Sequence, residues 1–304
     1  MRLLADLRYA ARTLAKSPSF ALIAVLSLAL GIGANTAMFS YVDAILLRPL
    51  PVPDSGRIVE VDSTAPNTRL GRMSYPDYAD LRDRTRTLES LVSYDFFFAG
   101  ISTQPNEVPK YSLDVIASGN FFSGLGIDTV AGRSFRPEED SVPGRDLVAV
   151  ISHGLWQQEY ALDPNVVGRK IRINGVDFTI VGIAPESFQG PQAFLAPQVY
   201  VPMNSFTQAL PGQSNDYLTN RNSRSLNLLG RLKPGVSASQ AQAELATIAR
   251  QLATQYPASN KDRSVRALGW VNARFENDPI DAQLALMLLS ITALVLLIAC
   301  ANVA

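Results

Sequence analysis

Two long uncharged segments, one near each end, constrain the fold of this chain more than any other feature. The first covers residues 17–42 and the second covers residues 283–304. As an α-helix rising about 1.5 Å per residue, each is long enough to cross a hydrocarbon layer about 30 Å thick. We therefore predict two transmembrane helices, over residues 18–47 (including a stalk) and 284–304, with a water-exposed domain at 48–280 between them.

The composition agrees with this division. Charged residues make up 18% of the chain, against about 25% in soluble proteins, and the deficit lies in the two uncharged segments. The 27 basic and 27 acidic residues give a net charge of zero. Because phosphate backbones demand a clustered Lys/Arg surface, which this chain lacks, we expect no nucleic-acid partner.

The residues before the first span predict its orientation. Four basic residues and one acidic residue precede it: Arg2, Arg8, Arg12 and Lys16, and Asp6. An excess of basic residues keeps that side of a span in the cytoplasm. A cleaved signal peptide is the alternative, but its apolar core is only about 7–15 residues long. Here the apolar character continues to Leu47, so we expect the helix to be retained.

Residues 1–17 allow two interpretations. Apolar residues recur at helical spacing at Leu3, Leu7, Ala11 and Leu14. This pattern predicts a basic amphipathic helix on the cytoplasmic membrane surface. An ordinary positively charged leader fits the pattern equally well.

Small or polar residues recur every four positions in the first span. They form two rows, Ala29, Gly33 and Ala37 in one and Ser27, Gly31 and Asn35 in the other. Small residues at this spacing let helices approach closely in lipid, and a polar Asn side chain avoids lipid. We predict helix–helix packing through Ala29, Gly33, Ala37 and Asn35. The alternative is that Gly and Ala are common in any span.

The middle of the chain alternates strands and helices. Strands are predicted at 57–62, 94–99, 225–231 and 263–270, and helices at 75–91 and from Ser237 to Pro257. They form two β-α-β units, so the fold class is α+β with a split or duplicated core. Between them, about 115–222 is an inserted strand-rich subdomain, with a hairpin turned by Asn174-Gly175 and a short helix capped by Ser152.

Residues for catalysis or metal binding are scarce. The chain has one histidine, His153, and one cysteine, Cys300, which lies in the second span. Zinc sites and Ser-His or Cys-His nucleophile pairs are therefore not expected, and no phosphate-binding loop occurs. We predict no catalytic, metal or cofactor-binding residues, and no enzymatic activity.

Three further segments have a plain interpretation and a functional alternative. Residues 138–140 (Glu-Glu-Asp) are interpreted as a solvated turn, with calcium binding as the alternative. Phe96, Phe97 and Phe98 are interpreted as alternating core of a strand, with an apolar face open to a substrate or partner as the alternative. The loop at 188–197 is interpreted as Pro-rich, with a partner contact as the alternative.

Four blocks of sequence, in order along the chain, resemble ABC-transporter permeases of the macrolide-exporter (MacB) type without a fused ATPase. They are DLRYAARTLAKSPSFALIAVLSLALGIGANTAMFSYVDAILLRPL from Asp6, GNFFSGLGIDTVAGRSFRPEED from Gly119, VAVISHGLWQQEYALDPNVVGRKIRINGVDFTIVGIAPESF from Val148 and GRLKPGVSASQAQAEL from Gly230.

The resemblance implies a bacterial inner-membrane subunit with a cytoplasmic N-terminus and a periplasmic domain. Its implied partners are a separate cytosolic ABC ATPase, a second permease copy or half, a periplasmic adaptor and the lipid bilayer. The implied function is export or mechanotransmission driven by the ATPase. The alternative is an FtsX-like module that regulates a cell-wall enzyme without transport. Since the chain ends within what would be the second helix, we expect a truncated permease region.

Overall fold

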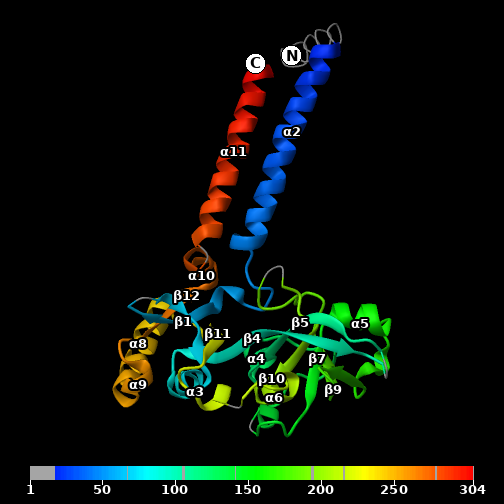
Figure 1. The fold of residues 1–304 in the computed structure, drawn as a ribbon. Helices are drawn as coiled ribbons and strands as arrows, with labels where there is room; N and C mark the ends of the chain where they lie inside the picture. Colours follow the sequence, from blue (N-terminus) through cyan, green and yellow to red (C-terminus); the bar gives the residue numbers. More distant parts are fainter. Residues whose placement is uncertain are drawn as a thin grey trace. The chain divides into compact units, whose positions relative to one another are not determined.

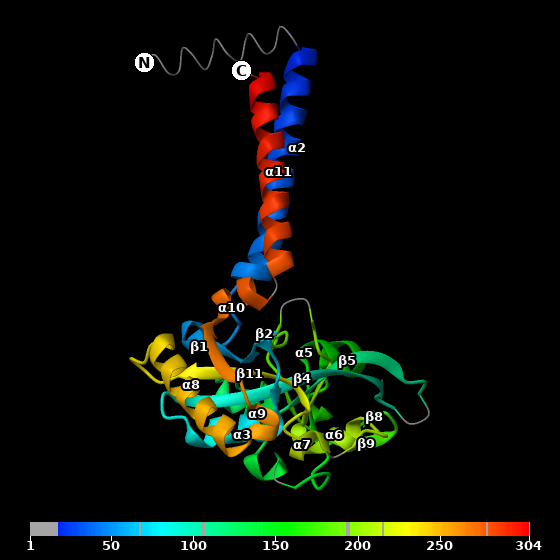
Figure 2. The ribbon, with the colours of Figure 1, turned by 60° about the vertical axis from the view of Figure 1, so that its left-hand side comes forward.

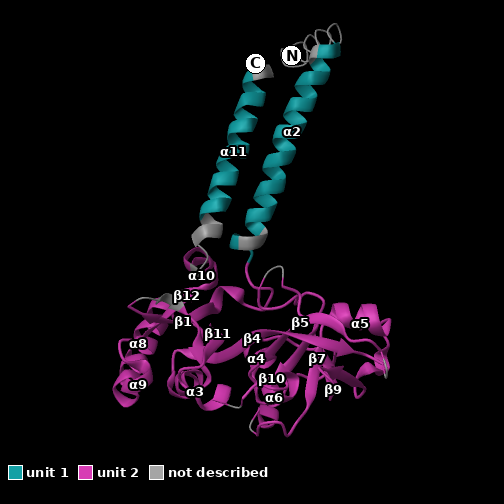
Figure 3. Ribbon diagram, viewed as in Figure 1, with its two compact units in different colours: residues 1–48, 277–304 teal, residues 49–276 magenta. Residues whose placement is uncertain are grey.

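The structure is a computed structural model that describes residues 18–66, 68–104, 107–140, 142–192, 195–214, 216–277 and 279–303. The chain divides into two compact units, shown in Figure 3. Unit 1 is Met1–Arg48 with Asn277–Ala304, and unit 2 is Pro49–Glu276. The amphipathic helix predicted over 1–17 lies outside the described residues.

Unit 1 contains two long helices that lie side by side (Figure 1). Helix α2 (Pro18–Val42) continues as a π-helical turn, η1 (Asp43–Leu47), and helix α11 covers Pro279–Val303. The helical segment ends at Arg48, which is extended, because a residue before proline disfavours the helical conformation. Only 11% of either apolar stretch, Ala21–Val42 or Gln283–Ala301, is buried. The core helix of a soluble protein would be mostly buried.

Unit 2 is built on one sheet of twelve strands in the described residues. Along the main path the strands are β12 (Ser264–Gly269), β1 (Ile58–Ala65), β11 (Arg224–Leu232), β4 (Leu88–Ser102), β5 (Lys110–Ala117), β10 (Val199–Pro202), β7 (Val148–Ile151), β9 (Val176–Ile183) and β6 (Ala131–Gly132). Off this path, β2 (Thr68–Gly71) pairs with β1, β3 (Met73–Ser74) with β11, and β8 (Lys170–Ile173) with β4 and β9.

The two β-α-β units are interleaved. Helix α3 (Tyr75–Arg84) lies in the connection from β1 to β4, after β2 and β3, and helix α8 (Ala238–Gln255) lies in the connection from β11 to β12. Strand β11 lies antiparallel between β1 and β4, while β1 lies antiparallel between β11 and β12. Helices α3, α8 and the short α9 (Pro257–Asn260) lie together on one side of these strands in Figure 2. The predicted split α+β core is confirmed.

Local sequence signals explain where the two helices begin. The Ser74 hydroxyl accepts the backbone N–H of Asp77 at the start of α3. At the start of α8, Ser237 and Gln240 cap each other's backbone N–H groups, which satisfies donors that the first turn leaves open.

The prediction that the first of these helices continues to residue 91 is wrong. It ends at Arg84, and β4 begins at Leu88. Glu244 of α8 accepts hydrogen bonds from the Thr85 hydroxyl and from the backbone N–H groups of Arg86 and Thr87. These bonds hold the chain out of the helix, and the following residues pair with β11.

The strand-rich middle contains the predicted hairpin. Strands β8 and β9 pair at Ile173 and Val176, with Asn174 at φ 47° and Gly175 at φ 87°, as a two-residue turn requires. Ser152 caps helix α5 (His153–Tyr160). The remaining short elements are η2 (Ser55–Arg57), α4 (Phe121–Gly124), η3 (Pro137–Asp140), η4 (Pro164–Val166), η5 (Met203–Ser205), α6 (Phe206–Ala209), α7 (Asp216–Thr219) and α10 (Trp270–Asn277).

Alternation along the strands gives unit 2 a core on each face of the sheet. Val59 and Val61 of β1 belong to one core, which also contains the buried faces of α3 and α8. Ile58, on the other face, belongs to a second core rich in aromatic rings. One sheet runs through both the split units and the strand-rich middle. The division into an inserted subdomain at 115–222 stays a prediction.

Candidate functional site

The best-defined candidate site of unit 2 is the place where its first and last segments are anchored. Leu50, near the start of the unit, and Trp270, near its end, are only 3% and 6% exposed. Both belong to the second, aromatic core, and Val52 and Val271 pack against it. The two segments that continue into the helices of unit 1 are therefore fixed in a common apolar core.

This core is packed around aromatic rings from three parts of the chain. The Phe122 ring centroid lies 5.4 Å from that of Phe121 and 5.2 Å from that of Tyr200, both edge to face. Phe188, from the loop after β9, lies 6.2 Å from Phe121. Interiors of this kind are close-packed and deform little, so they transmit displacement of an attached segment.

Hydrogen bonds from Arg231, at the end of β11, anchor the first segment. Its Nη1 donates to the Pro53 carbonyl oxygen at 2.9 Å, and Nε and Nη2 donate to the carbonyl oxygens of Gly124 and Leu125 at 3.2 and 2.5 Å. Burial, and then the neighbouring Arg57, lower the pKa of Arg231 from its ordinary value. The guanidinium joins the entering segment to α4 and to the central sheet.

Charged groups tie the last segment back to the sheet. Arg266 of β12 pairs with Glu276 of α10, with Nη1 and Oε2 2.5 Å apart. One turn into α10, the Arg274 guanidinium lies 4.6 Å from the centre of the Trp270 ring. The predicted strand at 263–270 ends one residue early, since Trp270 opens α10 instead. The segment that follows β12 is thus held in place by both apolar packing and ionic contacts.

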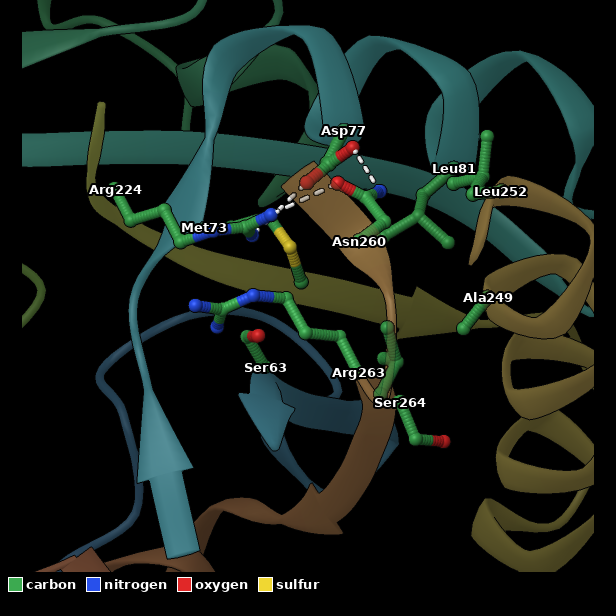
Figure 4. Close-up of a pocket in the computed structure, with 11 residues that line it drawn as sticks. Ser63, Met73, Asp77, Leu81, Arg224, Ala249, Leu252, Asn260, Arg263 and Ser264 are labelled. Atoms are coloured by element: carbon green, nitrogen blue, oxygen red, sulfur yellow. Dashed lines mark hydrogen bonds and ion pairs between the residues drawn. The ribbon is translucent and has the colours of Figure 1, made fainter. Parts of the chain in front are cut away.

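A second cluster joins the helix layer to β11, and Figure 4 shows Asp77, Arg224 and Asn260 from it. The Asp77 carboxylate, at the first turn of α3, pairs with Arg224 Nη1 at 2.9 Å and Arg221 Nη1 at 2.6 Å, and accepts from Asn260 Nδ2 at 2.8 Å. The adjoining cavity has a volume of about 20 Å³, enough for one water molecule. It is too small for a substrate, so this cluster is structural.

The structure separates the two rows of small residues in α2. In one row, Asn35 Nδ2 donates to the Thr292 carbonyl oxygen of α11 at 2.7 Å, and Gly31 is buried against Leu296. In the other row, Ala29, Gly33 and Ala37 are exposed. Only the row with Gly31 faces α11, because helical positions two residues apart point in different directions.

The predicted packing through Ala29, Gly33 and Ala37 is therefore not directed at α11. A Cβ added at Gly33 meets nothing within 4 Å. Packing of this face on a helix beyond the described residues stays a prediction.

The interpretation of residues 138–140 as a solvated turn is wrong for two of its three residues. Glu139 is buried and pairs with Arg133. Asp140 is half-buried and accepts the backbone N–H groups of Gly119 and Asn204 at 2.9 and 3.0 Å. Glu139 is therefore held by a neighbour in sequence, whereas the partners of Asp140 lie 21 and 64 residues away. No group of three or more metal-ligating side chains is found in the described part of the chain.

The remaining candidates divide between core and surface. The His153 ring packs edge to face on Trp156, 5.5 Å away. Phe97 is buried, as alternation in a strand predicts, whereas Phe98 is 56% exposed and stacks on Tyr111. Phe188 is a core residue, so the predicted loop is anchored at its start.

Reasoning from the sequence missed Arg231, Arg57 and Trp270. A signal was present for the first: Arg231 is the only charged residue in the apolar run that follows Ser225 in SLNLLGRL. A charged residue inside a buried strand requires partners in the fold. For Arg57 and Trp270, nothing in the local pattern distinguishes them from neighbouring residues.

Comparisons with known proteins agree with this fold. The family described as "MacB-like periplasmic core domain" matches residues 21–248, which is more than half of the chain. No curated protein sequence matches. A domain of a protein described as a permease from Porphyromonas gingivalis aligns with TM-score 0.53 and 15% identity, covering 72% of this chain and 93% of that one.

The periplasmic region of MacB from Actinobacillus actinomycetemcomitans aligns with TM-score 0.52 and 12% identity, covering 79% of this chain and 98% of that one. At such identities the structural likeness shows the fold alone, and the family match carries the assignment. Two apolar helices, with apolar stretches at Ala21–Val42 and Gln283–Ala301, precede and follow unit 2 in the sequence, as expected for a membrane protein with an extracytoplasmic domain. The chain belongs to the MacB-like periplasmic core domain family, within the MacB/FtsX-like ABC-transporter permeases.

Proposed function

We propose that this chain is a permease subunit that couples a cytosolic ATPase to its extracytoplasmic domain. One observation carries the proposal: Leu50 and Trp270, on the segments that continue into the two membrane helices, are buried in the same core of unit 2. A segment fixed in a close-packed core passes on the movement of the helix attached to it, whereas a flexible linker does not.

The proposed orientation places the N-terminus in the cytoplasm and residues 48–280 outside. The four basic residues before the first span support it. The proposed partners are a separate ABC ATPase on the cytoplasmic side, a second permease copy or half, and a periplasmic adaptor. Unit 2 would perform no chemistry in this scheme, and the packing of His153 against Trp156 agrees with a structural role for the one histidine.

A flexible insertion tests the coupling. Gly-Gly-Ser-Gly placed between Leu47 and Arg48 interrupts the segment between η1 and the anchor at Leu50. We expect it to abolish ATP-driven export by the assembled transporter, while thermal unfolding of unit 2 is unchanged. The measurement is export from cells or vesicles that contain the partner ATPase.

The matched control is the same insertion after Gly212, in an exposed loop where an added Cβ would meet nothing within 4 Å. This variant should export normally. Full export by the Leu47 variant would show that the first helix is only an anchor and that movement is relayed elsewhere.

A regulatory function is the second candidate. Phe98 and Tyr111 are 56% and 79% exposed, and their rings stack with centroids 5.3 Å apart. Such an exposed aromatic pair suits contact with a partner protein. If the chain controls a cell-wall enzyme, the Leu47 insertion will abolish cell-wall hydrolysis, and cells with the unmodified chain will show no export.

A further inference from the structure

A polar cavity of about 400 Å³ opens on unit 2, apart from the small cavity of Figure 4. Its wall comes from η2, the start of β4, α4 and the residue after its cap, and the end of β11. The charged side chains that line it are Asp54, Arg57, Glu89 and Arg231. The volume suits a small molecule or a lipid headgroup.

The floor of this cavity carries a buried positive charge. Arg231 is only 6% exposed, and three of its five N–H donors go to the carbonyl oxygens of Pro53, Gly124 and Leu125. Carbonyl oxygens solvate a guanidinium but do not cancel its charge. An anionic group placed here would therefore gain more than it would at an exposed arginine.

The rim of the cavity carries the opposite charge. The side chains of Asp54 and Glu89 are 71% and 52% exposed, and both pair with Arg57, whose side chain is 27% exposed. The Arg57 side chain is also bound to the sheet, since its Nε donates to the carbonyl oxygen of Leu232, at the end of β11, at 2.8 Å. Two carboxylates thus lie at the opening, and two guanidinium groups lie deeper.

A glycine in the cavity wall leaves the Arg231 guanidinium accessible from the cavity. Gly126 lines the cavity in the left-handed region, at φ 68°, and a Cβ there would lie 3.3 Å from Arg231 Nη2. Glycine at this position leaves space above the guanidinium. Ser90 and Ser123 add hydroxyl groups to the wall.

We infer that this cavity binds a small zwitterion that carries an anionic group and a primary amine, as phosphoethanolamine does. The anionic group would lie against Arg231, and the amine would pair with a rim carboxylate, Asp54 or Glu89, in competition with Arg57. A plain anion would leave the rim carboxylates without this additional partner, and a plain amine would meet the arginine floor. Charge complementarity therefore favours a ligand that carries both charges.

Binding is tested with the full chain in detergent micelles, by calorimetric titration with soluble phosphoethanolamine. Inorganic phosphate and ethanolamine, each alone, are expected to bind at least about tenfold more weakly, because each lacks one of the two charges. Equal binding of phosphate and phosphoethanolamine would overturn the assignment of a zwitterion.

The lipid and the free compound are distinguished by reconstitution. The chain is placed in bilayers of phosphatidylcholine with or without phosphatidylethanolamine, and the titration is repeated. Competition by phosphatidylethanolamine, seen as a weaker apparent affinity for the soluble compound, assigns the cavity to a lipid headgroup. An unchanged affinity assigns it to a free zwitterion.

A rim variant tests the site without disturbing the anchor at Arg231. Asp54→Asn with Glu89→Gln removes both carboxylates, and Asn tolerates the left-handed backbone of residue 54, at φ 49°. The variant should lose the roughly tenfold preference for phosphoethanolamine over inorganic phosphate, because the freed Arg57 acts on both anions while the amine has no carboxylate left to pair with. The exposed control Glu186→Gln should keep the preference of the parent. An unchanged preference in the rim variant, or no binding by the folded parent, would refute the proposal.

Discussion

The two units place their apolar side chains in opposite ways. In unit 1, Leu30 and Leu297 are 73% and 65% exposed, whereas in unit 2 Phe121 and Ile116 are at most 1% exposed. In water the hydrophobic effect drives burial, but lipid is as apolar as leucine, so α2 and α11 gain little by burying such residues against each other. Each unit is suited to a different solvent.

Polar contacts also differ between the units. In unit 1, the Asn35 side chain bonds across the helix pair, to the Thr292 carbonyl oxygen. In unit 2, a network of charges joins α3 to β11 through Asp77, Arg221 and Arg224. Close approach of small residues therefore holds unit 1, whereas unit 2 also depends on paired buried charges. Three substitutions test this distinction.

The largest effect is expected from Asp77→Ala in unit 2. The substitution leaves Arg221 and Arg224, whose side chains are 16% and 12% exposed, without their shared carboxylate. We expect unit 2 to lose about 3–5 kcal/mol of unfolding free energy and its melting temperature to fall by about 10 °C. Calorimetry of the full chain in detergent measures this.

Asp83→Ala is the matched control for that substitution. Asp83 lies on the same helix, but its side chain is 64% exposed in its pair with Arg82. Exposed pairs contribute about 1 kcal/mol or less. If the two variants have the same melting temperature, the buried network does not stabilise unit 2.

The second effect is a pH dependence of the stability of unit 2, which arises from the buried carboxyl group of Asp114. Asp114 is fully buried and accepts from the Ser112 hydroxyl and the Val199 N–H, and burial raises its pKa to about 7. In the unfolded chain an Asp titrates near pH 4. Between about pH 4 and 7 the unfolded chain therefore releases a proton that the native state keeps, and stability falls as pH rises. Asp140, with its pKa raised to about 6, acts in the same direction.

Asp114→Asn should remove much of this fall, since an amide keeps the acceptor for Val199 and carries no charge. We expect stabilisation on the order of 3 kcal/mol at pH 8 and little change at pH 4. Thermal unfolding at the two pH values measures the difference. An equal effect at both would mean that Asp114 does not titrate in this window.

The smallest effect is expected in unit 1, from Gly31→Leu. A Cβ at Gly31 would lie 3.1 Å from Leu296 Cδ1 and 3.4 Å from its Cα. The larger residue must separate the helices, at a cost of about 1–3 kcal/mol. Disulfide formation between Val42→Cys and Ala285→Cys, which belong to one apolar cluster, reports the separation in a Cys300→Ser background.

Gly33→Leu is the control in the same helix, because a Cβ at Gly33 meets nothing within 4 Å. Cross-linking should fall in the Gly31 variant and remain at the parent level in the Gly33 variant. Equal yields would show that close approach at Gly31 does not hold the pair together.

Features that depend on neighbours in sequence were predictable. The uncharged runs predicted both helices of unit 1, Asn174-Gly175 predicted the hairpin, and Ser237 predicted the start of α8. Each rests on short-range physics: transfer of apolar side chains, positive φ in a turn, or a side chain that caps the next turn of backbone. These signals act within a few residues and do not require knowledge of the fold.

Two lipid-compatible helices and an α+β domain could be predicted from the sequence, because hydrophobic length and periodicity are local properties. The end of α3 at Arg84 depends instead on a tertiary contact, since Glu244 holds the loop that follows. The partial burial of Asp140 and the hydrogen bonds by which Arg231 joins Pro53 to α4 are tertiary contacts as well. In each case the deciding partner lies more than sixty residues away, so its energy depends on which strands and helices meet.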